Sequence, residues 1–216
     1  GNSGEFYYHP FMTPEGYTQV NLQQHWQEAK ANMNFAETVN VQHYVCEAGL
    51  APKQQATPVY AGVTNYGYHL DAGKFAMLLQ RHCTEKLAVT HIQAHIDNIV
   101  ASPNGDIESL RTKDGQTITG DLFIDCSGST GLLINKHFDI GIIEQEHILF
   151  NNRALATQVP YFQQNDIASA TLSTAQTSGW IWDIGLPSRR GVGHTYSSNH
   201  INDDEAEQQL RRYIAT

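Results

Sequence analysis

GDLFIDCSGSTGLL, residues 120–133, is the stretch that decides the fold class. Its apolar segment Leu122–Ile124 leads into a small turn that carries glycine, and an apolar helix start follows at Leu132. That order is typical of a buried strand in an α/β sheet. Because open α/β sheets bind ligands beyond the carboxyl ends of their strands, we expect a ligand near Asp125, Cys126, Ser127 and Gly128. An ordinary tight turn is the alternative.

Upstream of this stretch the pattern predicts a helix and then strands. Asp71 is a good N-cap for a helix over Ala72–Lys86. Alternating apolar residues predict a strand over Val89–Ile96. Asn-Gly and Asp-Gly turns then predict three antiparallel strands, over Ile99–Ser102, Ile107–Thr112 and Gln116–Thr119.

The two ends of the chain differ in character. Residues 22–35 predict one helix, and residues 49–58 predict a loop. The C-terminal third predicts strands over Leu155–Val159, Ala168–Leu172, Gly179–Leu186 and Gly193–Ser197. A helix over Glu205–Ile214, capped by Asn202-Asp203, closes the chain. Together these elements predict a mixed α/β (α+β) fold with a β-rich C-terminal portion.

Composition excludes several classes of protein. The 216 residues are 40% hydrophobic, which is typical of a globular chain. A net charge of −9 without a basic stripe argues against a nucleic-acid partner. Apolar runs such as Ile140–Ile143 are far shorter than the roughly 20 residues of a membrane span. Three scattered cysteines form no disulfide framework and indicate a reducing cytoplasm.

The histidines do not predict a metal site. His91 and His95 are spaced as on one helix face, but the alternation around them is that of a strand. Four residues along a strand separate two side chains by about 13 Å. One zinc ion with ligands near 2 Å does not bridge that distance, so we expect no metal.

No self-contained catalytic motif is present in the sequence. It has no G-x-S-x-G, P-loop, H-E-x-x-H or C-x-x-C, and no G-x-G-x-x-G follows a strand. Gly191-Val192-Gly193 comes closest to the last of these, but the residues from His194 onward do not complete it. The chemistry must therefore be inferred from other features.

The segment GWIWDIGL, residues 179–186, is the most unusual of these features. On a strand, Trp180, Trp182 and Ile184 project to the same face, because side chains alternate with period two. Two indoles on one face would build a rigid apolar wall. An ordinary core face is the alternative.

Three segments together resemble the flavin-dependent tryptophan halogenases. Residues 178–184 are similar to the W-x-W-x-I-P signature of that family, although Gly185 stands in place of its proline. Residues 121–128 and 131–135 match its D-L-F-I-D-C-S-G and G-L-L-I-N elements, and residues 68–72 resemble its Y-x-W/H-x-D-A element. The order and spacing of all three also match, most strongly from Tyr66 onward.

The resemblance implies an incomplete flavin-monooxygenase-like (GR2-type) fold. Residues 59–150 would be a flavin-domain portion, and residues 1–58 and 151–216 would be substrate-domain portions. In the family, reduced FAD and oxygen oxidise chloride or bromide, and an essential lysine and a glutamate direct the halogen to an indole. A separate flavin reductase supplies the reduced FAD. The resemblance leaves open whether the protein forms a homodimer.

Site residues are carried over by matching position. Trp180, Trp182 and Ile184 would separate flavin from substrate. Cofactor-side positions would be Ile96, Asp125, Cys126, Ser127 and Gly128.

His9 and Phe11 resemble the aromatic pair that sandwiches the indole, with a surface aromatic cluster as the alternative. Stacking of this kind adds about 0.5–1.5 kcal/mol per pair beyond burial.

In the family, the FAD-phosphate motif and the lysine precede the region matched here, and the glutamate and the halide-binding backbone follow it. We therefore nominate no catalytic residue in these 216 residues and expect them alone neither to bind FAD tightly nor to halogenate. Part of a flavin hydroxylase or reductase of the same fold, and a non-catalytic module that binds aromatic ligands, are the alternatives.

Overall fold

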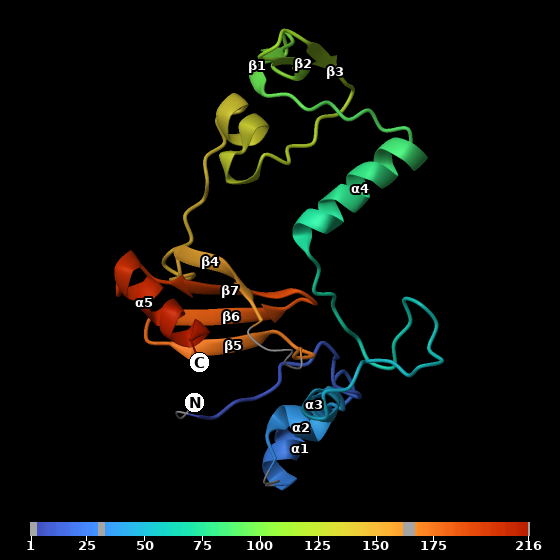
Figure 1. The fold of residues 1–216 in the computed structure, drawn as a ribbon, viewed down its shortest axis with the longest axis vertical. Coiled ribbons are helices and arrows are strands. Elements are labelled where there is room, and N and C mark those ends of the chain that lie inside the picture. The colour runs from blue at the N-terminus through green and yellow to red at the C-terminus, as the bar shows by residue number, and fades with distance from the viewer. Residues whose placement is uncertain (1–3, 30–32, 162–166, 216) are drawn as a thin grey trace. The chain divides into compact units, whose positions relative to one another are not determined.

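The computed structural model describes residues 4–29, 33–161 and 167–215 (Figure 1). The chain divides into two compact units. The first joins Gly1–Asp71 to Phe150–Thr216, and the second is Ala72–Leu149. The assignment of these segments to flavin and substrate domains stays a prediction.

A four-stranded antiparallel sheet forms the centre of the first unit, in the order β4-β7-β6-β5. Its strands are β4 Arg153–Pro160, β5 Leu172–Gln176, β6 Gly179–Gly185 and β7 Arg189–Tyr196. Helix α5, Asp203–Ile214, lies across one face of this sheet (Figure 1). The predicted C-terminal helix and the strands β4 and β6 are thus confirmed, whereas β7 begins at Arg189 instead of Gly193 and the strand predicted over Ala168–Leu172 is misplaced.

The face under α5 is the hydrophobic core of this unit. Its buried residues are Val159, Ile181, Val192 and Leu210, of which Ile181 is completely buried. Leu155, Tyr213 and Ile214 pack around them. Because side chains alternate along β6, the residues directly before and after Ile181 in the chain point to the opposite face of the sheet.

Asn202 caps helix α5 as predicted, and the helix begins at Asp203, before the predicted start at Glu205. The Asn202 side chain accepts a hydrogen bond from the Glu205 amide, and the Glu205 carboxylate accepts one from the Asn202 amide. This reciprocal capping satisfies two amides that have no partner within the helix. Acidic residues in the first turn and Arg211 and Arg212 in the last favour the same orientation of the helix dipole.

Three short helices precede the sheet: α1 Leu22–Ala29, α2 Phe35–Val39 and α3 Gln42–Glu47. The prediction of one helix through residue 35 is wrong at its end, and residues 30–32 lie outside the described part of the chain. Asn34 starts a new helix, because its side chain accepts from the Glu37 amide. The Trp26 indole N–H donates to the Met33 carbonyl at 2.9 Å, which connects α1 to the residue before the Asn34 cap of α2.

The second unit contains α4, Ala72–Lys86, and a three-stranded antiparallel sheet. The strands are β1 Ile96–Ala101, β2 Ile107–Thr112 and β3 Thr117–Thr119. Gly105 and Gly115 occupy the two turns with φ of 91° and 87°, values that favour glycine. The predicted helix and hairpins are confirmed.

Three predicted strands are wrong. Residues 89–95 form no strand, so that β1 begins only at Ile96. Leu122–Ile124 belongs to no strand, with Leu122 79% and Ile124 78% exposed. In the third case, the strand predicted over Ala168–Leu172 begins at Leu172 instead. An apolar pattern favours extended backbone, but a strand also needs a neighbour to receive its hydrogen bonds.

Two further observations concern the described residues as a set. No helix among them is both long enough and apolar enough to pass through a bilayer. Within the same ranges, no three His, Cys, Asp or Glu side chains come together as a metal-binding group. His91, one of the histidines considered above, makes a hydrogen bond to Gln80 at 2.9 Å.

Candidate functional site

Trp180, Trp182 and Ile184, which we call the tryptophan wall, lie along β6 on the face turned away from α5. The two indole centroids are 6.1 Å apart with their planes at 63°, an edge-to-face arrangement. Trp180 is 40% exposed and Trp182 is half-buried. The interpretation of this face as the core is therefore wrong, because the core is on the other side.

The floor around the two indoles is made of small side chains. In the strand register, Trp182 lies opposite Gly193 on β7 and Ser173 on β5, and Trp180 lies opposite Ala175. A Cβ on Gly193 would be 2.5 Å from Cε2 of Trp182 and closer still to Cζ2 and Cη2. The Trp182 ring thus lies directly over the backbone of β7.

Gly185 occupies the position where the family signature has proline. A Cβ there would lie 2.6 Å from Cγ2 of Ile167 and 3.3 Å from the Tyr161 hydroxyl. The backbone stays extended and paired through Gly185, and the Leu186 amide donates to the Arg189 carbonyl at 2.9 Å. The wall therefore ends in a tight connection to β7.

On the core face of β6, Asp183 forms a largely buried ion pair. Its carboxylate is 2.9 Å from Nη1 of Arg190 and accepts a hydrogen bond from the Tyr213 hydroxyl at 3.3 Å. The Asp183 side chain is 4% exposed and that of Arg190 is 28% exposed. This pair joins β6, β7 and α5 directly behind the wall.

The turn at residues 125–128 is organised by one carboxylate. Asp125 Oδ1 accepts from the amide and the hydroxyl of Ser127, and Oδ2 accepts from the amides of Leu133 and Ile134. Ser127 Oγ in turn accepts from the Leu132 amide at 2.7 Å. These bonds, that from the Ser127 hydroxyl foremost, lower the pKa of Asp125 to about 2.

This turn therefore begins a helix. The segment η1, Gly128–Thr130, leads into the π-helix η2, Leu132–His137. Gly128 has a φ of 65°, and a Cβ there would meet nothing within 4 Å. Cys126 is exposed and is a free thiol. The turn thus presents Cys126 and a bare glycine backbone to open space.

The other carried-over residues are placed as follows. Ile96 is half-buried at the start of β1, opposite Thr112. His9 and Phe11 are both exposed, Phe11 at 73%. The Phe11 ring lies beside Gly67, since a Cβ on that glycine would be 3.8 Å from Cζ of Phe11. The wall and the residues His9 and Phe11 belong to the first unit, whereas Ile96 and the turn belong to the second.

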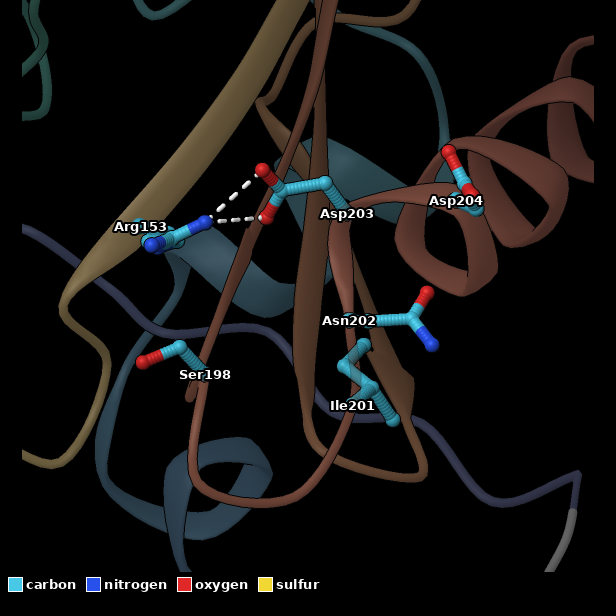
Figure 2. Close-up of a pocket in the computed structure, with 6 residues that line it drawn as sticks. All are labelled: Arg153, Ser198, Ile201, Asn202, Asp203 and Asp204. Carbon is cyan, nitrogen blue, oxygen red and sulfur yellow. Dashed lines mark hydrogen bonds and ion pairs between the residues drawn. The ribbon is translucent and has the colours of Figure 1, made fainter.

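A polar pocket of about 420 Å³ at the start of α5 was not expected from the sequence. Figure 2 shows Arg153 facing Asp203, with Nη1 at 2.6 and 2.7 Å from the two carboxylate oxygens. The Tyr196 hydroxyl also donates to Asp203, and these bonds lower the pKa of that carboxyl. The remaining lining residues are Ser198, Ile201, Asn202 and Asp204. The acidic first turn of α5 was the only sequence signal, and the arrangement serves to fix α5 to β4 and β7.

Comparison with known proteins gives a consistent result. The family model described as tryptophan halogenase matches residues 1–216. The tryptophan 7-halogenase RebH of Lentzea aerocolonigenes is 35% identical over 95% of this chain and 39% of its own length. The crystal structure of a tryptophan halogenase from Shewanella frigidimarina NCIMB 400 is 47% identical with a TM-score of 0.92, over 100% of this chain and 42% of that one.

Tar14, a tryptophan C-6 flavin-dependent halogenase (chlorinase) from taromycin biosynthesis, matches with a TM-score of 0.89 at 30% identity. That match covers 98% of this chain and 43% of Tar14. The chain therefore spans about two-fifths of the length of the relatives that it matches.

Proposed function

The chain belongs to the tryptophan halogenase family, and from that premise we propose that it supplies the partition between a flavin site and an indole site. The complete protein would use reduced FAD, O2 and chloride or bromide to halogenate tryptophan or a related indole. The relatives are named for different ring carbons, position 7 for RebH and C-6 for Tar14. The proposal therefore names the substrate class and no ring carbon.

The tryptophan wall is the observation that carries this proposal. Two large rings in edge-to-face contact stand on the side of the sheet that α5 leaves uncovered. Apolar rings of this size on an uncovered face are typical of a surface that contacts another group. Because β6 is an interior strand with neighbours on both sides, these rings stand on a rigid support.

The residues present fit a flavin in a specific way. The Asp125 carboxylate already accepts four hydrogen bonds, and the Ser127 hydroxyl both donates and accepts, so these side chains would shape the turn. Direct contact with the cofactor would fall to Cys126, to the open backbone at Gly128 and to Ile96. When bound, reduced FAD would react with O2 and so supply the oxidation of the halide. The fold of the complete protein would be of the flavin-monooxygenase (GR2) type.

His9 and Phe11 are the proposed substrate contacts. Both rings are exposed and two residues apart, so they are available to a flat ligand. A separate flavin reductase would reduce the FAD. We also keep a cytoplasmic location as a proposal, because the three cysteines are free thiols.

The test uses the full-length protein with FAD, a purified flavin reductase, NADH, air and tryptophan. Parallel reactions contain chloride, bromide or no halide, and mass spectrometry reads the products. We expect tryptophan with the chlorine or bromine isotope pattern only when the matching halide is present. An oxygenated product without halide would replace the proposal with a flavin hydroxylase. Binding of tryptophan by calorimetry without any product or flavin requirement would favour a non-catalytic module.

A further inference from the structure

Gly193 on β7 has a geometric relation to the wall that its neighbour Gly191 does not share. Both glycines project toward the wall face, opposite Trp182 and Ile184 respectively. Neither has a positive φ, so neither is required for its backbone conformation. A Cβ on Gly193 would overlap the benzo ring of Trp182, whereas a Cβ on Gly191 would meet nothing within 4 Å.

We propose that Gly193 is a positioning residue, whose missing side chain lets the Trp182 indole lie flat against β7. Its contribution to catalysis rests on the proposed partition function, but its effect on the Trp182 ring does not. Any side chain at residue 193 would lift the ring from the β7 backbone. The two indole centroids of the wall are 6.1 Å apart in an edge-to-face arrangement, so a displaced Trp182 also changes its contact with Trp180.

Gly193 of the Gly-Val-Gly segment of β7 therefore has a role unrelated to phosphate binding. Val192 points to the opposite face, where it is 1% exposed in the core. The alternation of glycine and valine thus gives β7 a bare surface under the wall and an apolar side chain under α5.

The experiment compares Gly193→Ala with Gly191→Ala in the full-length protein, without flavin or halide. Two indoles held at a fixed angle give an exciton couplet in the far-ultraviolet circular dichroism spectrum. The part of the couplet that disappears in Trp180→Phe belongs to this pair. We expect Gly193→Ala to lose that part or to invert it, and Gly191→Ala to keep it. An unchanged couplet in Gly193→Ala, or the lack of any loss in Trp180→Phe, would overturn the proposal.

A second comparison distinguishes displacement of the Trp182 ring from a general failure of Gly193→Ala to fold. In a Trp182→Ala background the ring is gone, so adding Gly193→Ala should leave the thermal midpoint unshifted, while Gly193→Ala alone lowers it. If the double variant is also destabilised or unfolded, glycine is needed at residue 193 for another reason and the proposal is wrong.

A third readout connects the geometry to the proposed function. In the complete reaction, Gly193→Ala should lower the yield of halogenated product per NADH consumed, and Gly191→Ala should not. A full-length protein that halogenates nothing would refute the proposed function, and the spectroscopic comparison would still decide the role of Gly193.

Discussion

The two faces of β6 should respond differently to truncation. Ile181 is completely buried under α5, and replacing a buried isoleucine by alanine costs about 2–5 kcal/mol of unfolding free energy. Trp180 lies on the other face and is 40% exposed, so truncation there removes only part of the burial of a core side chain, together with the edge contact with Trp182. That contact contributes about 0.5–1.5 kcal/mol beyond burial. We therefore expect Ile181→Ala to destabilise the chain by about 4 kcal/mol and Trp180→Ala by about 2 kcal/mol.

Urea unfolding of the purified chain at 25 °C, followed by intrinsic fluorescence, measures both values. Trp26 and Trp182 remain as probes in either variant, and both lie in the same unit as β6. Ile181→Val is the matched control and should cost about 1 kcal/mol. Equal destabilisation by Ile181→Ala and Trp180→Ala would show that both faces are packed alike. In that case the argument for an uncovered wall fails.

Three other perturbations test the remaining geometry. Arg190→Met leaves the buried Asp183 carboxylate without its ion-pair partner, with only the Tyr213 hydroxyl remaining among the bonds described above, and should cost about 3 kcal/mol in urea unfolding. Asp183→Asn should cost less, and the reverse order would contradict the burial of Asp183. Asp125→Asn should speed hydrogen exchange of the Leu133 and Ile134 amides. The pKa of Asp125 is lowered to about 2, so its contribution is complete above the unfolded value of about 4 and lost as pH falls through 2. A difference between wild type and Asp125→Asn that persists below pH 2 would refute this. In the full-length protein, Phe11→Ala should raise KM for tryptophan about threefold to tenfold with little change in kcat. An unchanged KM would remove Phe11 from the proposed substrate site.

Local signals predicted most of the secondary structure. The Asn-Gly and Asp-Gly turns placed both hairpins of the second unit, because each turn needs a glycine with positive φ at a fixed position. Asn202 and Glu205 likewise fixed the start of α5 through hydrogen bonds that span three residues. Such signals depend only on near neighbours in the sequence, and so they are visible there.

Pairing and burial could not be predicted in the same way. Residues 122–124 have the composition of a buried strand, but no described segment pairs with them, and Leu122 and Ile124 are exposed. The alternation of side chains along a strand predicted that Trp180 and Trp182 lie on one face, and the structure confirms this. It did not show which face is the core, because that depends on where α5 packs, and α5 begins only after β7 in the chain. The relation of Gly193 to Trp182 needs the register between two strands, which no local pattern encodes.

The alternation along β6 also explains how a partition of two indoles can be rigid while one of its faces is uncovered. Asp183 lies between Trp182 and Ile184 in the chain and points to the opposite side, where Arg190 and Tyr213 hold it. Ile181, between the two tryptophans, is fixed in the core in the same way. Each wall residue is therefore flanked along the strand by a residue that cannot move without opening the core. A site placed on such a strand keeps its geometry better than a site on a loop, because packing of the far face fixes the backbone that carries it.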